Sequence, residues 1–185
     1  MTQAKSFPTS RIIRKITYCA VLIALGLVLP FLTGQIPEVG SALSPLHIPA
    51  ILAGFTVGPV WGAVCAFIIP ILRSAIFTMP PMFPMACTMA FEMAAYALTA
   101  GIFQRIFPKT VGYLYLSQGI AMVTGRIVYG IVFALFTLNN PNISYGFTAF
   151  ITGCFVEAIP GIVLHLIIIP PIVIALRKAK LTAES

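Results

Sequence analysis

Four charged side chains stand inside long uncharged stretches of the sequence: Arg73, Glu92, Arg126 and Glu157. A charge in apolar surroundings is costly, so such residues usually mark a substrate site, an ion pathway or a proton relay. Arginine binds carboxylates through two parallel hydrogen bonds. These four residues therefore predict a polar site for a small molecule. The alternative is that they form two neutralising ion pairs, Arg73 with Glu92 and Arg126 with Glu157, which only fix helix packing.

The sequence motifs of catalysis and metal binding are absent. There is no GxxxxGK[ST] phosphate loop, no GxSxG nucleophile elbow and no HExxH pair, so we do not expect the chain to hydrolyse ATP or to be an enzyme. Neither His47 nor His165 has a second histidine at metal-ligand spacing, and His165 is expected to be a structural hydrogen-bonding group. We therefore expect no metal and no cofactor, and an intramembrane enzyme is the weakest alternative.

The composition shows that these charges lie in a membrane protein. Of the 185 residues, 59% are hydrophobic and only 8% are charged, whereas about 25% of residues are charged in soluble domains. A helix needs about 20 apolar residues to cross a bilayer. Uncharged runs near or above that length cover residues 16–37, 39–72, 74–91, 127–156 and 158–176. We expect an all-α integral membrane protein with one transmembrane domain, residues 1–185.

Prolines and glycines divide these runs into about six helices. They are expected at residues 16–32, from 47 to the turn at 58–62, and at 63–78, 85–103, 112–138 and 147–176. The second, which begins near His47, is short enough to be tilted or to lie partly buried among its neighbours. The proline-rich residues 79–84 end the third helix.

The basic residues indicate how these helices are oriented. Nine of the eleven Lys and Arg residues lie in the N-terminal segment 1–15, in the connection that carries Arg105 and Lys109, and in the tail 177–185. Such flanking positive charges mark the cytoplasmic side of a membrane. Six helices place all three segments on that side, with both termini cytoplasmic. The net charge of +7 then reflects membrane orientation and not nucleic-acid binding.

The same topology places the isolated charges at one depth. At a rise of 1.5 Å per residue, Arg73 and Arg126 lie about 20 Å along their helices from the cytoplasmic side. Glu92 and Glu157 lie about 10 to 17 Å below the outer surface. His47 falls at the outer start of its helix. The sequence therefore predicts a polar pocket that opens to the outside.

Several stretches of the chain occur in a recognisable order. A basic N-terminus is followed by Ala20 and Ala24 in AVLIA, and then come LHIPAILAGFTVGPVWGAV (46–64), LRSAIFTMPPMFP (72–84), MAFEMAAYAL (89–98) and GRIVYGI (125–131). Together they resemble the substrate-binding S component of an energy-coupling factor (ECF) transporter for vitamins. The HIP and GPxxG portion is similar to the riboflavin-type branch, within a group that includes the pantothenate and pyridoxine types.

This resemblance implies a function and a set of partners. S components bind a vitamin in an outward pocket and topple in the membrane while docked on a transmembrane T component, which is joined to two cytoplasmic ATPases. By resemblance, Ala20 and Ala24 would contact the T component, and an AxxxA step lets another helix approach closely. The chain would be a multi-pass protein of the bacterial cell membrane, and ATP would be used only by its partners.

The candidate site residues suggest more than one vitamin. Pantothenate is favoured, because Arg126 or Arg73 would bind its carboxylate while Glu92 or Asn140 takes hydroxyl or amide groups. His47 belongs to the same expected site.

Pyridoxine or hydroxymethylpyrimidine is the alternative substrate. Glu92 would then bind a ring nitrogen, and Phe83, Tyr96 or Tyr145 would stack on the ring. A different function, a stand-alone proton-coupled carrier, would use Glu92 or Glu157 as the titrating group.

Overall fold

The computed structural model describes residues 8–33, 44–137, 159–179 and 181–182, and every regular element in them is helical. Five helices are long and apolar enough to cross a membrane, and α3 is a shorter apolar one. The predicted all-α membrane fold is confirmed. The helices are α1 (Pro8–Val28), α3 (His47–Val57), α4 (Pro59–Phe77), α5 (Cys87–Ile106), α6 (Val111–Thr137) and α8 (Ile159–Lys178). A 3-10 turn, η1 (Leu29–Thr33), follows α1, and a π-helical turn, η2 (Met82–Ala86), precedes α5.

Most helix boundaries agree with the sequence to within a few residues. The main difference is α1, which begins at Pro8 and not near residue 16. Proline suits the first position of a helix, and the Arg and Lys residues that follow are good helix formers. The basic segment therefore extends the helix instead of preceding it. The described part of the last helix begins at Ile159, and residues 147–158 lie outside the described residues.

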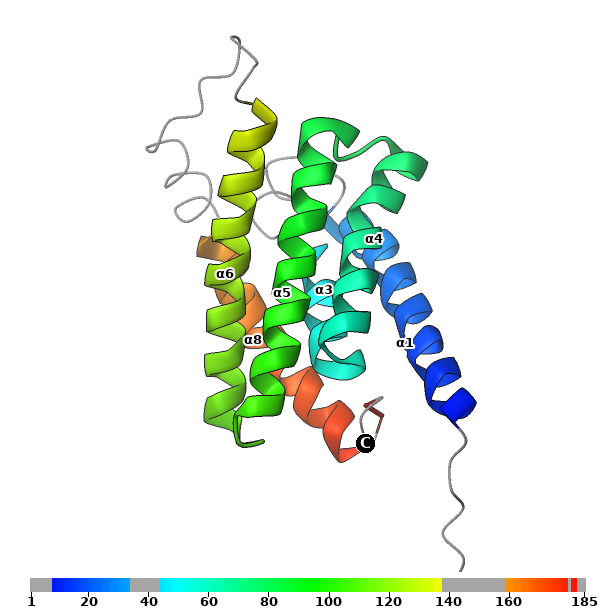
Figure 1. Cartoon of the computed structure of the whole chain (residues 1–185), viewed down its shortest axis with the longest axis vertical. Coiled ribbons are helices and arrows are strands. Elements are labelled where there is room, and N and C mark those ends of the chain that lie inside the picture. Colours follow the sequence, from blue (N-terminus) through cyan, green and yellow to red (C-terminus); the bar gives the residue numbers. More distant parts are fainter. Residues whose placement is uncertain (1–7, 34–43, 138–158, 180, 183–185) are drawn as a thin grey trace, which may run out of the picture.

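The short helix α3 lies at the centre of the molecule (Figure 1). All of its residues are buried, and it packs against α1, α4, α5 and α8. A helix that is apolar on every side must be covered on every side. Its eleven residues span only about 16 Å, so its first residue, His47, lies within the protein. The predicted burial of this helix among its neighbours is confirmed.

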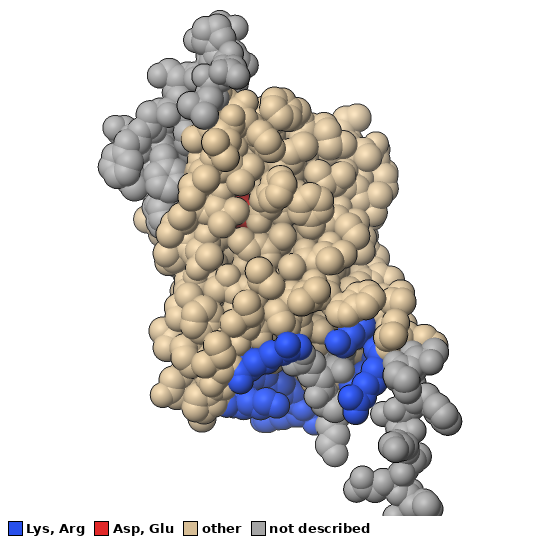
Figure 2. Space-filling model, in the orientation of Figure 1, with Lys and Arg blue, Asp and Glu red and all other residues tan. Residues whose placement is uncertain are grey.

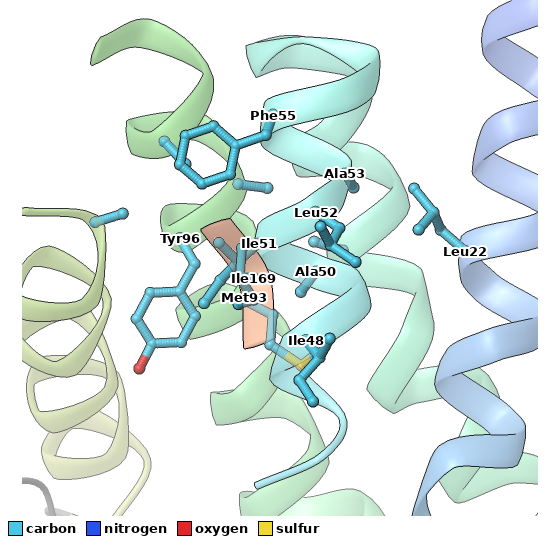
Figure 3. Packing of buried hydrophobic residues seen from close by; sticks show 14 of the residues in the cluster. Leu22, Ile48, Ala50, Ile51, Leu52, Ala53, Phe55, Met93, Tyr96 and Ile169 are labelled. Atoms are coloured by element: carbon cyan, nitrogen blue, oxygen red, sulfur yellow. The ribbon is translucent and has the colours of Figure 1, made fainter. Parts of the chain in front are cut away.

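The other helices form an arc around α3. Contacts run from α1 to α4, from α4 to α5, from α5 to α6 and from α6 to α8. Figure 3 shows side chains from several of these helices meeting in one apolar core, among them Leu22, Ile51, Met93 and Ile169. Burying such side chains holds the short central helix within the longer ones.

Two glycines let α3 and its neighbours approach closely. A side chain on Gly54 would overlap the backbone carbonyl of Ala97, so α3 and α5 meet there backbone to backbone. Gly58 joins α3 to α4 with φ of 100°, a conformation that glycine adopts without strain.

Basic residues gather at one end of the molecule (Figure 2). The start of α1, the turn from α3 to α4, the connection from α5 to α6 and the end of α8 all lie at that end (Figure 1). The prediction that these segments share one side is confirmed. By the positive-inside rule this end faces the cytoplasm, and the opposite end, where α4 connects to α5, faces outward.

Candidate functional site

A buried carboxylate is the centre of the polar interior. Glu92, on α5, is 1% exposed and lies against three polar side chains. Tyr96 donates its hydroxyl to Oε1 at 2.6 Å, and Arg126 Nη1 lies 3.0 Å from the same oxygen. His47 Nε2 lies 3.3 Å from Oε2. A buried carboxylate is tolerated when its oxygens are paired in this way.

Three helices place these groups together. Tyr96 follows Glu92 by one helical turn, so both lie on the same face of α5. Arg126 comes from α6, which packs against α5, and His47 is the first residue of α3. Gly125, next to Arg126, leaves room for the Tyr96 ring, because a side chain there would overlap the ring. The close approach of α5 and α6 therefore sets the distance between Glu92 and Arg126.

Two histidines meet beside this carboxylate. His47 Nδ1 and His165 Nε2 each lie 3.2 Å from the backbone oxygen of Ser44, and the ring centroids are 6.0 Å apart. The two ring nitrogens of His47 thus face two different oxygens, one of Glu92 and one of the Ser44 backbone. His165 is in turn fixed by Gln118, whose Nε2 donates to the His165 carbonyl at 2.8 Å.

Sequence reasoning did not include His165 in the site. It treated this residue as a structural hydrogen-bonding group, and the contact with Ser44 agrees with that part. Its position beside His47 could not be found from spacing, because the two histidines are 118 residues apart. Their contact depends on how α8 crosses the short helix α3.

The alternative in which Arg73 pairs with Glu92 is wrong. Arg73 is 5% exposed, and its Nη1 donates to the backbone oxygen of Leu27 at 2.8 Å. Glu92 is instead paired with Arg126. The reason is the direction in which each arginine faces: Arg73 points from α4 toward α1, whereas Arg126 lies on the α6 side of α5. The other expected pair involves Glu157, which lies outside the described residues.

The remaining candidates divide into three groups. Phe83 is 61% exposed and packs against Phe136 at a centroid distance of 5.2 Å, so it does not belong to the buried cluster. Ala20 and Ala24 are exposed on α1. Asn140 and Tyr145 lie outside the described residues. Among the residues that are described, no group of three or more His, Cys, Asp or Glu side chains could hold a metal ion.

Glu92 and Tyr96 lie in the half of α5 that is farther from the basic end of the molecule. Glu92 is about 8 Å from the start of α5, and Arg126 is about 17 Å from the end of α6. Comparison with known families agrees with this architecture, because the family model of the ECF transporter, substrate-specific component, matches residues 14–173. The chain belongs to this family. Searches of the curated proteins and of the solved structures found no match.

Membership identifies the chain as the substrate-specific subunit, or S component, of an ECF transporter. This is a family of transporter binding subunits and not of catalytic enzymes, and its members dock in general with a T component and ATPases. In this S component the buried carboxylate of Glu92 contacts polar side chains from three helices, α3, α5 and α6.

Proposed function

We propose that this S component binds a water-soluble vitamin with a carboxylate, pantothenate being the best candidate, from the outside of a bacterial cell membrane. It would release the vitamin inside when docked on a T component and two ATPases. The chain would need no cofactor, because its partners would use the ATP. The observation that carries the proposal is the buried cluster of Glu92, Arg126, His47 and Tyr96.

Arg126 is the residue of this cluster best suited to bind an anion. Its side chain is 12% exposed, whereas that of Glu92 is 1% exposed, so the arginine is the more accessible partner. A guanidinium has five N–H donors and can remain paired with Glu92 while it binds a second carboxylate. The two histidines beside Glu92 add ring nitrogens that can form further hydrogen bonds. The preference of arginine for carboxylates favours an anionic vitamin.

The other candidate residues would take the neutral parts of the vitamin. Glu92 and His47 would accept or donate hydrogen bonds to hydroxyl and amide groups, and Tyr96 would keep Glu92 in place. Asn140 would bind a hydroxyl or amide group of pantothenate, whereas Phe83 and Tyr145 would stack on the ring of a heterocyclic vitamin.

Docking would use the exposed face of α1. Ala20 and Ala24 are exposed, and α1 also presents large apolar side chains at the surface, including Val21 and Val28. Two small residues one turn apart let a partner helix approach the backbone closely. We propose that the T component docks there.

Pyridoxine or hydroxymethylpyrimidine remains the second candidate substrate, favoured by one contact. Glu92 lies against the aromatic residue Tyr96, and a carboxylate beside an aromatic ring is what a nitrogen heterocycle needs. A neutral vitamin of this kind would depend on Glu92 and not on Arg126.

The test is binding by the detergent-purified chain. Native mass spectrometry would show a vitamin retained from the expression host, and calorimetric titrations with pantothenate, pyridoxine, hydroxymethylpyrimidine and riboflavin would follow. We expect pantothenate to bind and Arg126→Gln to weaken it about 30-fold or more, since truncating a partner of a buried charge pair costs about 2 kcal/mol or more. Arg105→Gln, at the cytoplasmic end, is the matched control and should leave affinity unchanged.

Other outcomes would change the assignment. Binding of pyridoxine that survives Arg126→Gln and is lost in Glu92→Gln would favour the second candidate. A chain that ignores the whole panel, yet takes up a solute in vesicles without any ATPase, would contradict the proposal and support a proton-coupled carrier.

A further inference from the structure

Helices α1 and α4 pack along a regular seam. On α4, Trp61, Cys65 and Ile69 follow each other at intervals of four residues, which places them on one face. The thiol of Cys19 donates to the Trp61 carbonyl at 3.8 Å, and the thiol of Cys65 donates to the Cys19 carbonyl at 3.6 Å. One turn farther along, Ile69 fills the space beside Gly26, where a side chain would come within 2.6 Å of it. The residue numbers rise together on both helices, so α1 and α4 run parallel.

Arg73 and Phe77 continue this face of α4 at its outer end. Arg73 Nη1 donates to the Leu27 carbonyl at 2.8 Å. Its guanidinium carbon lies 5.4 Å from the ring centroid of Phe31 and 5.3 Å from that of Phe77. The two rings meet edge to face at 5.1 Å. The charge of Arg73 is therefore held by a carbonyl and two aromatic faces at the point where α1 ends.

The hydrogen bond from Arg73 to Leu27 lies at the end of a helix, where it stabilises the structure more than an ordinary side-chain hydrogen bond. Leu27 lies in the last turn of α1, where carbonyls have no partner within the helix. Hydrocarbon supplies no donor for such groups, and a cation near a helix C-terminus is favourable. Arg73 meets each of these requirements. It also places its own buried charge against aromatic rings, which attract cations.

Helix α1 is attached to the rest of the molecule along one side, where it packs against α3 and α4. Its buried residues Leu22 and Gly26, together with Pro30 in the following turn η1, form a narrow stripe with a spacing of four residues. The opposite face, which carries Ala20 and Ala24, is exposed. A helix attached along one stripe can rotate or tilt unless a specific contact fixes it. Arg73 is the charged residue on the α4 side of this stripe.

We propose that Arg73 is a positioning residue that fastens the outer end of α1 to α4 and so holds Ala20 and Ala24 in place for docking, while vitamin binding does not require it. The docking part rests on the function proposed above. The inference replaces the sequence-based expectation that Arg73 binds substrate. It agrees with the geometry of Glu92, which lies against Tyr96, Arg126 and His47 without Arg73.

The experiment measures the position of α1 directly. Spin labels attached at Val28→Cys and Ile76→Cys, two exposed positions at the outer ends of α1 and α4, report the distance between the helices. The native cysteines are replaced by serine, whose hydroxyl can still donate to the carbonyls that Cys19 and Cys65 contact. We expect a narrow distance distribution with Arg73 and with Arg73→Lys, whose amine can still reach the carbonyl. Arg73→Met, which keeps bulk but removes the donor and the charge, should broaden it. Arg105→Met, at the exposed cytoplasmic end of α5, should leave it narrow.

Binding and assembly are measured on the same variants without labels. Arg73→Met should bind pantothenate within about threefold of the unmodified chain, a difference of less than 1 kcal/mol, but should copurify poorly with the T component and ATPases. Arg73→Lys should restore assembly. A narrow distance distribution in Arg73→Met would overturn the proposal. A loss of pantothenate binding in that variant would overturn it as well, because the proposal gives Arg73 no part in binding.

Two further outcomes are misfolding of Arg73→Met and absence of pantothenate binding by the unmodified chain. If Arg73→Met does not fold, Phe31→Leu removes one of the two rings over the guanidinium, and a distribution that stays narrow there would count against the proposal. If the unmodified chain does not bind pantothenate, the proposed substrate is wrong. The spin-label distances then still decide whether Arg73 fastens α1.

Discussion

The Tyr96 hydroxyl and the Arg126 guanidinium meet at the same oxygen of Glu92, although they come from different helices. Their meeting depends on the absence of a side chain at Gly125, against which the Tyr96 ring packs. The contact between α5 and α6 and the pairing of the buried charge are therefore one structural feature. A change to either helix at this level should affect both.

Breaking the pair of Glu92 and Arg126 should destabilise the fold strongly. Removing one partner of a buried ion pair typically costs about 3–5 kcal/mol, because the other charge is left without compensation. We expect Glu92→Gln and Arg126→Gln each to lower the free energy of unfolding, and the double variant to lose clearly less than the sum. Unfolding by SDS in mixed micelles measures these values. Strictly additive losses would show that the two residues do not interact.

Gly125→Ala should disturb the same cluster without touching a charged group. The added methyl group would overlap the Tyr96 ring, and overpacking of this kind costs about 1–3 kcal/mol. Gly119 on the same helix is the matched control, because nothing lies within 4 Å of a side chain placed there. Gly119→Ala should be neutral or slightly stabilising, as glycine weakens a helix interior. Thermal unfolding in detergent compares the two, and equal effects would contradict the predicted overlap.

Tyr96→Phe should have a smaller effect than either charge substitution. It removes one hydrogen bond to a carboxylate, worth about 1.5–3 kcal/mol, but leaves Arg126 and His47 on Glu92. We expect reduced thermal stability and a loss of pantothenate affinity that is smaller than the loss caused by Arg126→Gln. A variant that binds no vitamin while remaining as stable as the unmodified chain would instead identify Tyr96 as a direct ligand contact.

Ala24→Trp should separate docking from binding. A large side chain on the exposed face of α1 would keep a partner helix away from the backbone, so copurification with the T component and ATPases should fall at least tenfold while pantothenate affinity is unchanged. Ile131→Trp is the control, because Ile131 is 56% exposed on the distant helix α6. Equal loss of assembly in both variants would remove α1 from the docking surface.

Much of the fold follows from local features of the sequence. Charges and prolines interrupt the apolar runs, so helix number, the shortness of α3 and the end of α4 at Phe77 could be predicted, and the structure has them. The shared end of the basic segments follows from the even number of helices. The start of α1 at Pro8 differs from the expectation because Arg and Lys are good helix formers, so the charged segment lies within the helix.

The site was predictable in depth but not in pairing. Counting residues along helices placed Glu92, Arg126 and His47 near one level, and they do meet. The same count could not separate Arg73 from Arg126 as the partner of Glu92, because both were expected at that level. Residue counts could not place His165 in the cluster either. Its contact is with Ser44, which precedes a helix that begins inside the protein and not at the membrane surface.

The sequence by itself determined that this chain is a helical membrane protein, which end is basic, and how far along each helix the isolated charges lie. These properties depend on composition and on the constant rise of a helix. Only the tertiary structure decided which way each charge faces, because that depends on the rotation of a helix against its neighbours. Packing at Gly125 brings Arg126 to Glu92, and packing at Gly26 brings Arg73 to the end of α1.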